Sequence, residues 1–156
     1  MLKFRFADSA DVNLLFAWTN EKAVRENSYE QKKIEYNEHL NWFNQKLCSG
    51  NCTIYIFIDD EDLPVGQVRI EREAENKQAI AGIIVNANNR GKGYSSEMIK
   101  QASLDFLKKN LGFTILAYIM KKNISSYKSF MKAGYKLLRE DVIKEVPSFI
   151  LFKNQD

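Results

Sequence analysis

The sequence contains few of the residues from which metal sites and disulfide frameworks are built. Its 156 residues include two cysteines, Cys48 and Cys52, and a single histidine, His39. A closed structural zinc site needs four Cys or His ligands, so this inventory excludes one. We expect the two thiols to be reduced structural groups near a loop.

Long apolar runs and strong charge are absent as well. No window approaches the roughly 18 consecutive apolar residues of a membrane span, and the segment MLKFRFADSADV lacks the apolar core of a signal peptide. We therefore expect a cytoplasmic protein with no membrane partner. The 23 basic and 20 acidic residues give a formal net charge of +3. That balance is too mild to indicate nucleic acid and suits an anionic ligand equally well.

The residues that are present indicate a folded domain. Apolar residues make up 45% and charged residues 28% of the sequence, as in globular proteins. A chain of 156 residues is long enough to bury a real core. We predict a single domain over residues 1–156, without internal repeats or a long linker.

Strands and helices are predicted from the period of the apolar residues. Strands are expected over residues 2–6, 53–58, 64–71, 78–85, 113–120, 135–142 and 148–152. Helices are expected from Asp8 or Ser9 to about residue 20, over 34–47, from just after Arg90 to about 109, and over 123–132. Residues 21–33 are expected to form a loop with short helical pieces, and Pro147 to lie in a turn. This order implies a mixed α/β sheet with helices on both faces. The apolar run 78–85 is typical of a strand buried on both faces.

The junction between residues 78–85 and the next helix carries the strongest chemical signal. It reads N-A-N-N-R-G-K-G-Y-S, a glycine-rich turn that leads into a helix N-terminus. Free N–H groups and the positive end of the helix dipole make such a terminus an anion site. Glycines let the backbone approach a phosphate, and Arg90 and Lys92 add charge. The spacing fits neither the P-loop nor the dinucleotide fingerprint, and a tight turn without a ligand is the alternative.

This loop resembles the acetyl-CoA signature of the GNAT superfamily of N-acetyltransferases, Q/R-x-x-G-x-G/A. Arg90 takes the first place and Gly93 the first glycine, while Ser95 replaces the usual final Gly or Ala. A second block, from Asn123 to Tyr135, resembles the family's N-x-x-A/S-x-x-x-Y-x-K-x-G-F/Y segment. The resemblance extends over essentially all of the sequence in the order of its elements.

The resemblance implies the GNAT fold, with a mixed sheet of about six to seven strands and a splayed strand pair that holds acetyl-CoA. No metal is implied. The end of the strand 78–85 would pair with the pantetheine amides like an added strand, and the loop would hold the pyrophosphate through backbone N–H groups. Asn123 would contact the pantetheine arm or order the splayed strands. The cofactor-binding residues expected on this basis are Ile83, Ile84, Val85, Arg90, Gly91, Lys92, Gly93, Tyr94, Ser95, Asn123, Ser126 and Phe130.

The implied reaction is direct attack of a primary amine on the thioester carbonyl. An alkylammonium has a pKa of about 10, so the site needs a base and donors for the oxyanion. The family's usual oxyanion donor is a backbone N–H near Val85. Many relatives place a tyrosine that protonates the leaving thiolate where this chain has Phe130. Tyr127 and Tyr94 are possible substitutes, and the coenzyme A thiolate is a fair leaving group without an acid.

Three side chains are candidates for the base. Glu71 and Glu73 follow each other along the strand before the apolar run, where solvated strand-edge charges are the alternative. His39 is the side chain whose unperturbed pKa lies near neutrality, although a lone helical histidine is usually structural. We name Glu71, His39 and Tyr127 as the catalytic candidates.

The acceptor is indicated by residues 18–43. They resemble the W-R/T-N-x-x-x-V-R-x-x-S … H-x-x-W-F pattern of GNATs that acetylate nucleotide-linked amino sugars of the pseudaminic acid pathway. By this resemblance the substrate-binding residues are Arg25, Ser28, His39 and Trp42. Arg25 would pair with a nucleotide phosphate and Trp42 would stack on a base or sugar, with helix core as the alternative for Trp42.

Other acceptors and a role without catalysis stay open. The beginning of the sequence also resembles enzymes that acetylate protein N-termini, including those of ribosomal proteins, and polyamine and aminoglycoside acetyltransferases share its style. The mixed charge of residues 21–38 argues weakly against polyamines. A CoA-binding module without activity is the alternative that Phe130 raises. The resemblance is compatible with a homodimer.

Overall fold

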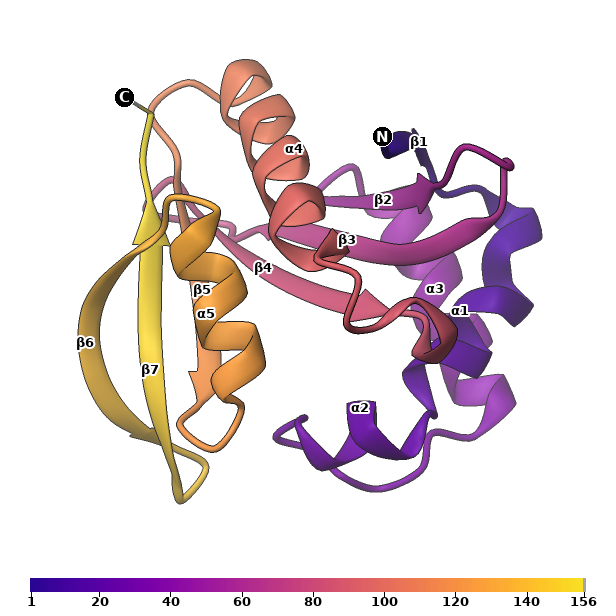
Figure 1. Cartoon of the computed structure of the whole chain (residues 1–156), viewed down its shortest axis with the longest axis horizontal. Helices are drawn as coiled ribbons and strands as arrows, with labels where there is room; N and C mark the ends of the chain where they lie inside the picture. Colours follow the sequence, from indigo (N-terminus) through magenta and orange to yellow (C-terminus); the bar gives the residue numbers. More distant parts are fainter. Residues whose placement is uncertain (156) are drawn as a thin grey trace.

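The computed structural model describes residues 1–155. Seven strands form one sheet in the order β1-β2-β3-β4-β5-β7-β6 (Figure 1). The strands are β1 (Lys3–Phe6), β2 (Cys52–Ile58), β3 (Pro64–Arg72), β4 (Gln78–Val85), β5 (Thr114–Met120), β6 (Lys136–Ile143) and β7 (Val146–Lys153). The helices are α1 (Val12–Thr19), α2 (Lys22–Glu26), α3 (Tyr36–Ser49), α4 (Tyr94–Lys109) and α5 (Ile124–Lys132), with short 3-10 helices η1 (Ser9–Asp11) and η2 (Ala87–Asn89). β4 and β5 run parallel and the other neighbours antiparallel, which confirms the predicted mixed α/β sheet.

The first helices begin and end at the residues that carry local signals. Asp8 and Asp11 form a capping box before α1, in which the Ala10 N–H donates to Asp8 at 2.9 Å. Arg5 donates two hydrogen bonds to Asp11 at 2.7 and 2.8 Å and lowers the pKa of that carboxyl. α3 ends at Gly50, whose φ of 71° lies in the left-handed region that glycine tolerates.

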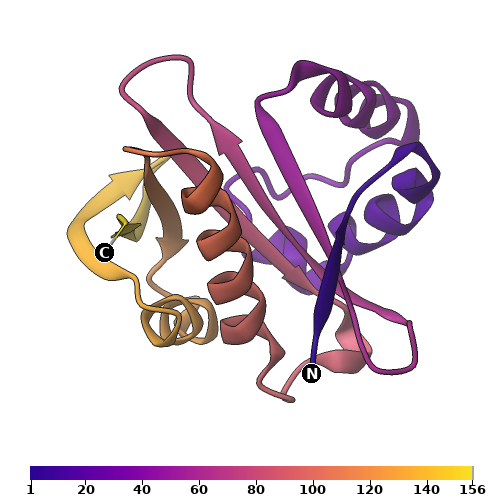
Figure 2. The same ribbon diagram turned by 90° about the horizontal axis from the view of Figure 1, so that it is seen from above.

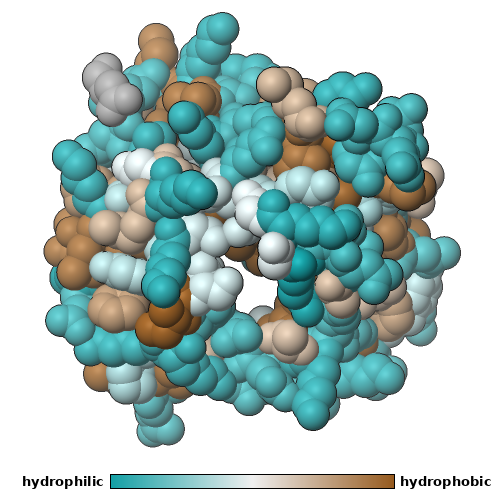
Figure 3. Space-filling model, viewed as in Figure 1, coloured by the Kyte–Doolittle hydropathy of each residue, from teal (hydrophilic) through white to brown (hydrophobic). Residues whose placement is uncertain are grey.

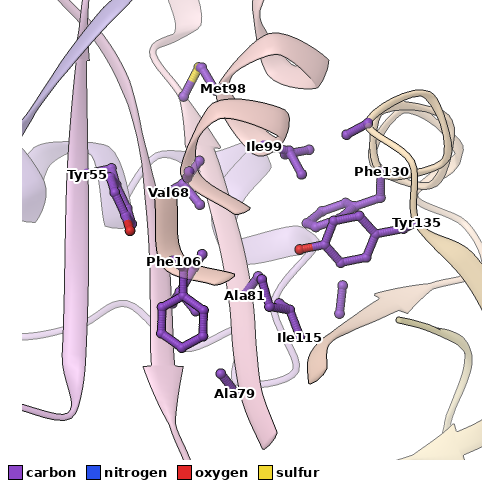
Figure 4. Packing of buried hydrophobic residues seen from close by; sticks show 14 of the residues in the cluster. Tyr55, Val68, Ala79, Ala81, Met98, Ile99, Phe106, Ile115, Phe130 and Tyr135 are labelled. Atoms are coloured by element: carbon purple, nitrogen blue, oxygen red, sulfur yellow. The ribbon is translucent and has the colours of Figure 1, made fainter. Parts of the chain in front are cut away.

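Helices cover both faces of the sheet, as predicted (Figure 2). Along β2, Tyr55 and Phe57 belong to the core under α4 and α5, whereas Ile54 and Ile56 pack beneath α1 and α3. This alternation is the period of two that a strand imposes on its side chains. Figure 4 shows the first core, in which side chains of α4 lie over those of β3 and β4.

Two details differ from the expectations. Within β4 only Ala79 and Ala81 are fully buried, so the strand is not buried on both faces, because its second half has no neighbour on one side. Pro147 lies within β7 and not in the turn, which is formed by Lys144 and Glu145 with φ values of 47° and 68°. Both cysteines are free, as expected, and burial raises the pKa of the Cys52 thiol to about 11.

The parallel pair at the centre of the sheet opens like a V. β4 and β5 pair over only three positions, Gln78 to Ile80 with Thr114 to Leu116. Beyond them β5 stays with β7 as far as Met120, while β4 stays with β3 to its end. The splayed strand pair is therefore confirmed. Within residues 1–155, no helix is both long and apolar enough to cross a membrane.

Candidate functional site

The backbone of β4 has hydrogen-bonding groups that face the open side of the V. The Asn86 N–H donates to the Val65 carbonyl at 2.8 Å, so the even-numbered residues of β4 bond to β3. The Thr114 N–H donates to the Lys77 carbonyl at 3.0 Å, so the odd-numbered residues face β5. Where β5 turns away, these odd-numbered residues face the gap.

Ile83 thus presents its N–H and carbonyl to the gap, and Val85 presents its N–H, since the Val85 carbonyl accepts a hydrogen bond from Arg90. An extended polar chain lying there can pair with them as an added strand. Ile84 does not fit the pairing role expected for it, because its backbone bonds with Gln67 of β3 and its side chain packs in the core beneath α1 and α3.

The loop after β4 forms an anion cradle from backbone groups. Gly91 and Gly93 have φ values of 79° and 77°, a conformation that other residues rarely adopt. α4 begins at Tyr94, later than expected, and no side chain among the described residues caps its N-terminus. Its first N–H groups and the helix dipole are therefore available to an anion.

The side chain of Arg90 points away from this cradle. Its Nε donates to the Val85 carbonyl at 3.1 Å, and its guanidinium forms an ion pair with Glu21 at the start of α2. Lys92 is exposed beside the loop. The cradle therefore rests on backbone N–H groups, and Arg90 links the end of β4 to the segment that carries α2.

Serines tie the N-terminus of α4 to the middle of α5. Ser129 Oγ donates to the Ser125 carbonyl at 3.0 Å, so Ser95 is the donor in the 2.6 Å bond between Ser95 and Ser129. Asn123 caps α5 by accepting the Ser126 N–H at 3.3 Å. A serine where the family has Gly or Ala thus fixes α4 against α5.

The aromatic side chains of α5 face the core. Phe130 is 2% exposed and packs edge-to-face on Tyr135 at 4.9 Å, as Figure 4 shows. Tyr127 lies against Phe149 of β7, with ring centroids 4.5 Å apart. In the part of the chain that the structure describes, the hydroxyls of Tyr127 and Tyr94 make no hydrogen bond to another residue.

The segment between α2 and α3 bridges the two halves of the V. Ser148 Oγ donates to the Val146 carbonyl at 3.0 Å, so Tyr29 is the donor in its 2.7 Å bond to Ser148. Burial raises the pKa of Tyr29. Lys144 of the β6–β7 turn forms an ion pair with Glu30 at 2.8 Å. Figure 3 shows an opening through the molecule here, between α5 and the end of β4.

Arg25 and Ser28 hold this bridging segment, which consists of residues 27–35. Arg25 donates to the carbonyls of Thr19 at 2.9 Å and Glu30 at 2.8 Å, and to Ser28 Oγ at 3.3 Å. Ser28 donates to the Val24 carbonyl at 2.6 Å. Because these donors are in use, the geometry does not support the phosphate-binding role expected for Arg25.

His39 lies outside the V as well. It is 2% exposed, with its ring parallel to that of Phe43 and its Nε2 3.2 Å from the Val12 carbonyl. Burial lowers the pKa of His39, which the Val12 carbonyl opposes. This placement between α1 and α3 favours a structural role over that of a base.

The face of β3 opposite α4 carries charged side chains beside β4. Glu71 forms an ion pair with Lys46 of α3, and the Arg69 guanidinium lies 5.0 Å from the centre of the Trp42 ring. Arg69, Glu71 and the exposed Glu73 line a hollow of about 410 Å³ together with Ile80, Arg72 and Ala74. This surface, called here the acceptor face, lies across the sheet from the α4 cradle.

Sequence reasoning missed Arg69, Glu21, Tyr29 and Ser148. Arg69 had a signal, because Gln67, Arg69 and Glu71 alternate with apolar residues along β3. Glu21, Tyr29 and Ser148 bond to residues that are far away in the sequence, and the local sequence around each of them does not indicate these bonds.

Residues 2–136 match the profile of a family described as acetyltransferase (GNAT) domain. The chain belongs to the GNAT acetyltransferase family. The match includes both predicted motifs, the loop of residues 90–95 and the block of residues 123–135. This family match confirms the expected acetyltransferase, and several solved structures with the same fold contain CoA or acetyl-CoA, the expected cofactor. A search of curated protein sequences found no significant match.

Solved structures share the fold along nearly the whole length. A spermidine N-acetyltransferase from Vibrio cholerae, in complex with CoA and spermine, is 16% identical, with a TM-score of 0.85 over 97% of this chain and 94% of that one. The aminoglycoside acetyltransferase AAC(6')-Ib with coenzyme A is 16% identical, with a TM-score of 0.82 over 99% and 95%. A domain from Methanocaldococcus jannaschii is 23% identical, with a TM-score of 0.81 over 99% of each chain. The finer resemblance to amino-sugar and N-terminal acetylases stays a prediction.

Proposed function

We propose that this GNAT acetyltransferase transfers acetyl to the primary amine of a small acceptor by direct attack on the thioester. The observation that carries the proposal is the continuous path of main-chain donors. It runs from Ile83 and Val85, on the open edge of β4, to the N-terminus of α4. Such a path matches a ligand with amides at one end and a pyrophosphate at the other.

The residues around this path fit acetyl-CoA. A Cβ added at Gly91 or Gly93 would meet nothing within 4 Å, so the surface of the cradle is open to a ligand. Residues 90–95 hold the pyrophosphate through N–H groups, and Ile83 and Val85 pair with the pantetheine arm. Asn123 and Ser126 order the N-terminus of α5 beside it. Bound acetyl-CoA supplies an activated acetyl group as its thioester.

Groups of the protein then stabilise the oxyanion and accept the proton of the attacking amine. An N–H on the open edge of β4 donates to the carbonyl oxygen as it becomes an oxyanion. Glu71 lies opposite Ile80, the last β4 residue paired with β5, and takes the proton of the ammonium through water. Phe130 has no proton to give, so the thiolate leaves unaided or with Tyr127 as the acid.

The acceptor that we propose is the amino group of a nucleotide-linked amino sugar. Support comes from the acceptor face, which offers an arginine and a half-buried tryptophan beside the gap. A polyamine is the second candidate, since a neighbour in structure is a spermidine enzyme. It is disfavoured by the mixed charge of residues 21–38, because a polyamine site needs a cluster of acidic side chains. The expected cytoplasmic location and homodimer stay predictions.

Release of coenzyme A with a panel of amines tests the function. The panel contains a UDP-linked 4-amino sugar, spermidine, kanamycin and a peptide with a free N-terminus, and mass spectrometry identifies the acetylated product. We expect the fastest turnover with the sugar. Faster turnover with the peptide than with any amino sugar contradicts that acceptor. Binding of coenzyme A without turnover on any amine supports the non-catalytic module instead.

A further inference from the structure

Arg69 is the arginine without a polar partner. Within residues 1–155 its guanidinium makes no ion pair and no hydrogen bond, although the residue is half-buried. Carboxylates or main-chain carbonyls satisfy the other arginines, which are Arg5, Arg25, Arg72, Arg90 and Arg139. The guanidinium nitrogens of Arg69 are not buried, so their five donors are open to water. They are therefore free to bind an anionic ligand without breaking a bond within the protein.

The surroundings of Arg69 hold it in place and leave space beside it. The Trp42 ring lies 5.0 Å from the guanidinium carbon, which is within the range of a cation–π interaction. Trp42 also lies beside the buried His39, with ring centroids 5.8 Å apart, and packs against the core beneath α1 and α3. On β4 the residue paired with Arg69 is Gly82, where an added Cβ would meet nothing within 4 Å. The surface of β4 beside Arg69 is therefore not covered by another residue.

This space adjoins the position where acyl transfer takes place in the proposed function. Gly82 directly precedes Ile83, whose N–H faces the gap, and adjacent strands lie about 5 Å apart. A group bound by Arg69 would thus sit within roughly 10 Å of an amine that attacks beside Ile83. The distance suits a small acceptor that carries an amine and an anion on one ring.

We propose that Arg69 forms a subsite for an anionic group of the acceptor, a phosphate or carboxylate, and that Trp42 positions its guanidinium. The inference rests on the proposed function and deepens it, because it assigns the charge of the acceptor. The planar fork of arginine matches two oxygens of either anion. The subsite lies on the acceptor face, and Arg25 takes no part in it.

Matched acceptors test the subsite. Glucosamine 1-phosphate carries a phosphate, an aminouronic acid carries a carboxylate, and methyl glucosaminide carries neither. We expect the wild type to prefer an anionic acceptor in kcat/KM, and the ratio of the two anions identifies the group. Arg69→Gln should lower the preference by about 10- to 100-fold, the range for a charge-assisted hydrogen-bonded pair. The preference of Arg69→Lys should lie between those of the wild type and of Arg69→Gln, because lysine keeps the positive charge but lacks the planar donor geometry of arginine.

Two further variants separate the subsite from general effects. Trp42→Leu should lower the preference less than Arg69→Gln does, with an unchanged KM for acetyl-CoA. Lys100→Ala removes an exposed positive charge of α4, on the other face of the sheet, and should leave the preference unchanged. An unchanged affinity for coenzyme A shows that each variant is folded.

The two proposals fail in different ways. Equal kcat/KM for the charged and neutral acceptors, unaffected by Arg69→Gln, overturns the subsite and leaves amine acetylation standing. If no amine is acetylated, the proposed function fails, and calorimetry with glucosamine 1-phosphate still decides the subsite. Binding that Arg69→Gln abolishes then supports it, and binding that the variant retains, or no binding to the wild type, overturns it.

Discussion

Single side chains determine which proton transfers this enzyme can perform. Phe130 occupies the position of a tyrosine in the sequence pattern that this chain resembles, and its ring is buried against Tyr135. His39, the single histidine, is enclosed between α1 and α3. Of the side chains considered for the base, Glu71 lies on the acceptor face at the point where β4 and β5 part.

Glu71→Gln should therefore lower kcat by about 100-fold or more, the usual range for loss of a general base. The KM for acetyl-CoA should change little, since the residue lies across the sheet from the cradle. Steady-state release of coenzyme A measures both constants. Glu73→Gln is the matched control, because Glu73 lines the same hollow and is exposed. Equal losses in the two variants would remove Glu71 from the role of base.

His39 gives stability a dependence on pH. Its folded-state pKa is below the usual 6.5, so the unfolded chain binds more protons in the window between those two values. The free energy of unfolding should therefore fall as the pH drops from about 6.5 through the folded-state pKa. Urea unfolding from pH 7.5 to 5.5 measures the slope. His39→Gln should flatten it, and an unaltered slope would mean that carboxylates alone produce it.

Helices, strands and the segments between them place the cradle and the acceptor face, the two sites proposed for the acetyl donor and the acceptor, on opposite sides of the sheet. The cradle depends on two left-handed glycines before α4, and the opening beside it depends on the bridging segment. Single substitutions can test the cradle and the bridging segment separately. For each of them a similar residue elsewhere in the chain provides a control.

Gly93→Ala should weaken binding of acetyl-CoA at least 10-fold. The new Cβ strains a residue with a φ of 77° and occupies space that the pyrophosphate needs. Gly50→Ala is the control, since Gly50 has a φ of 71° and equally open surroundings at the end of α3. Both variants should lose about 1 kcal/mol of stability, whereas calorimetry should detect weaker binding in Gly93→Ala alone. The same loss of affinity in both would indicate a global effect.

Tyr29→Phe should loosen the bridge over the V. It removes the hydroxyl that donates to Ser148 and should cost about 1 kcal/mol of stability. The KM for the amine should rise while that for acetyl-CoA stays constant, because the bridging segment bonds to the β6–β7 hairpin and not to the cradle. Tyr36→Phe is the control, for Tyr36 donates to Asn13 on the exposed surface of α1 and α3. A rise in both KM values would contradict a role confined to the acceptor.

The contrast between these segments explains what the sequence could predict. The strands, the main helices and the cradle follow from local patterns, such as the apolar run of β4 followed by Gly91 and Gly93. The bridge does not, because Tyr29 and Ser148 are 119 positions apart and both are ordinary polar residues. The roles expected for Arg25 and His39 came from a resemblance, and packing around each of them decides how its donors are used.

The molecule as a whole consists of two parts of one sheet that share little strand pairing at the V and are packed under one core of α4 and α5 side chains. β4 and β5 share three paired positions, and further links come from the Ser95–Ser129 bond and the bridging segment. A ligand that pairs with β4 inside the V replaces the strand contact that β5 gives up. Cofactor binding should therefore strengthen the join between the two parts.

Saturation with coenzyme A should raise the melting temperature accordingly. At 100 times the Kd, binding to the folded state alone adds about 2.7 kcal/mol, which for a domain of this size corresponds to roughly 5–10 °C. Scanning calorimetry measures the shift, and Gly93→Ala should reduce it at the same concentration. Hydrogen exchange gives the sharper result, since the N–H groups of Ile83 and Val85 face the gap and should become protected. The N–H of Ile84 already bonds to β3 and should change less, so equal protection of all three would contradict the added-strand geometry.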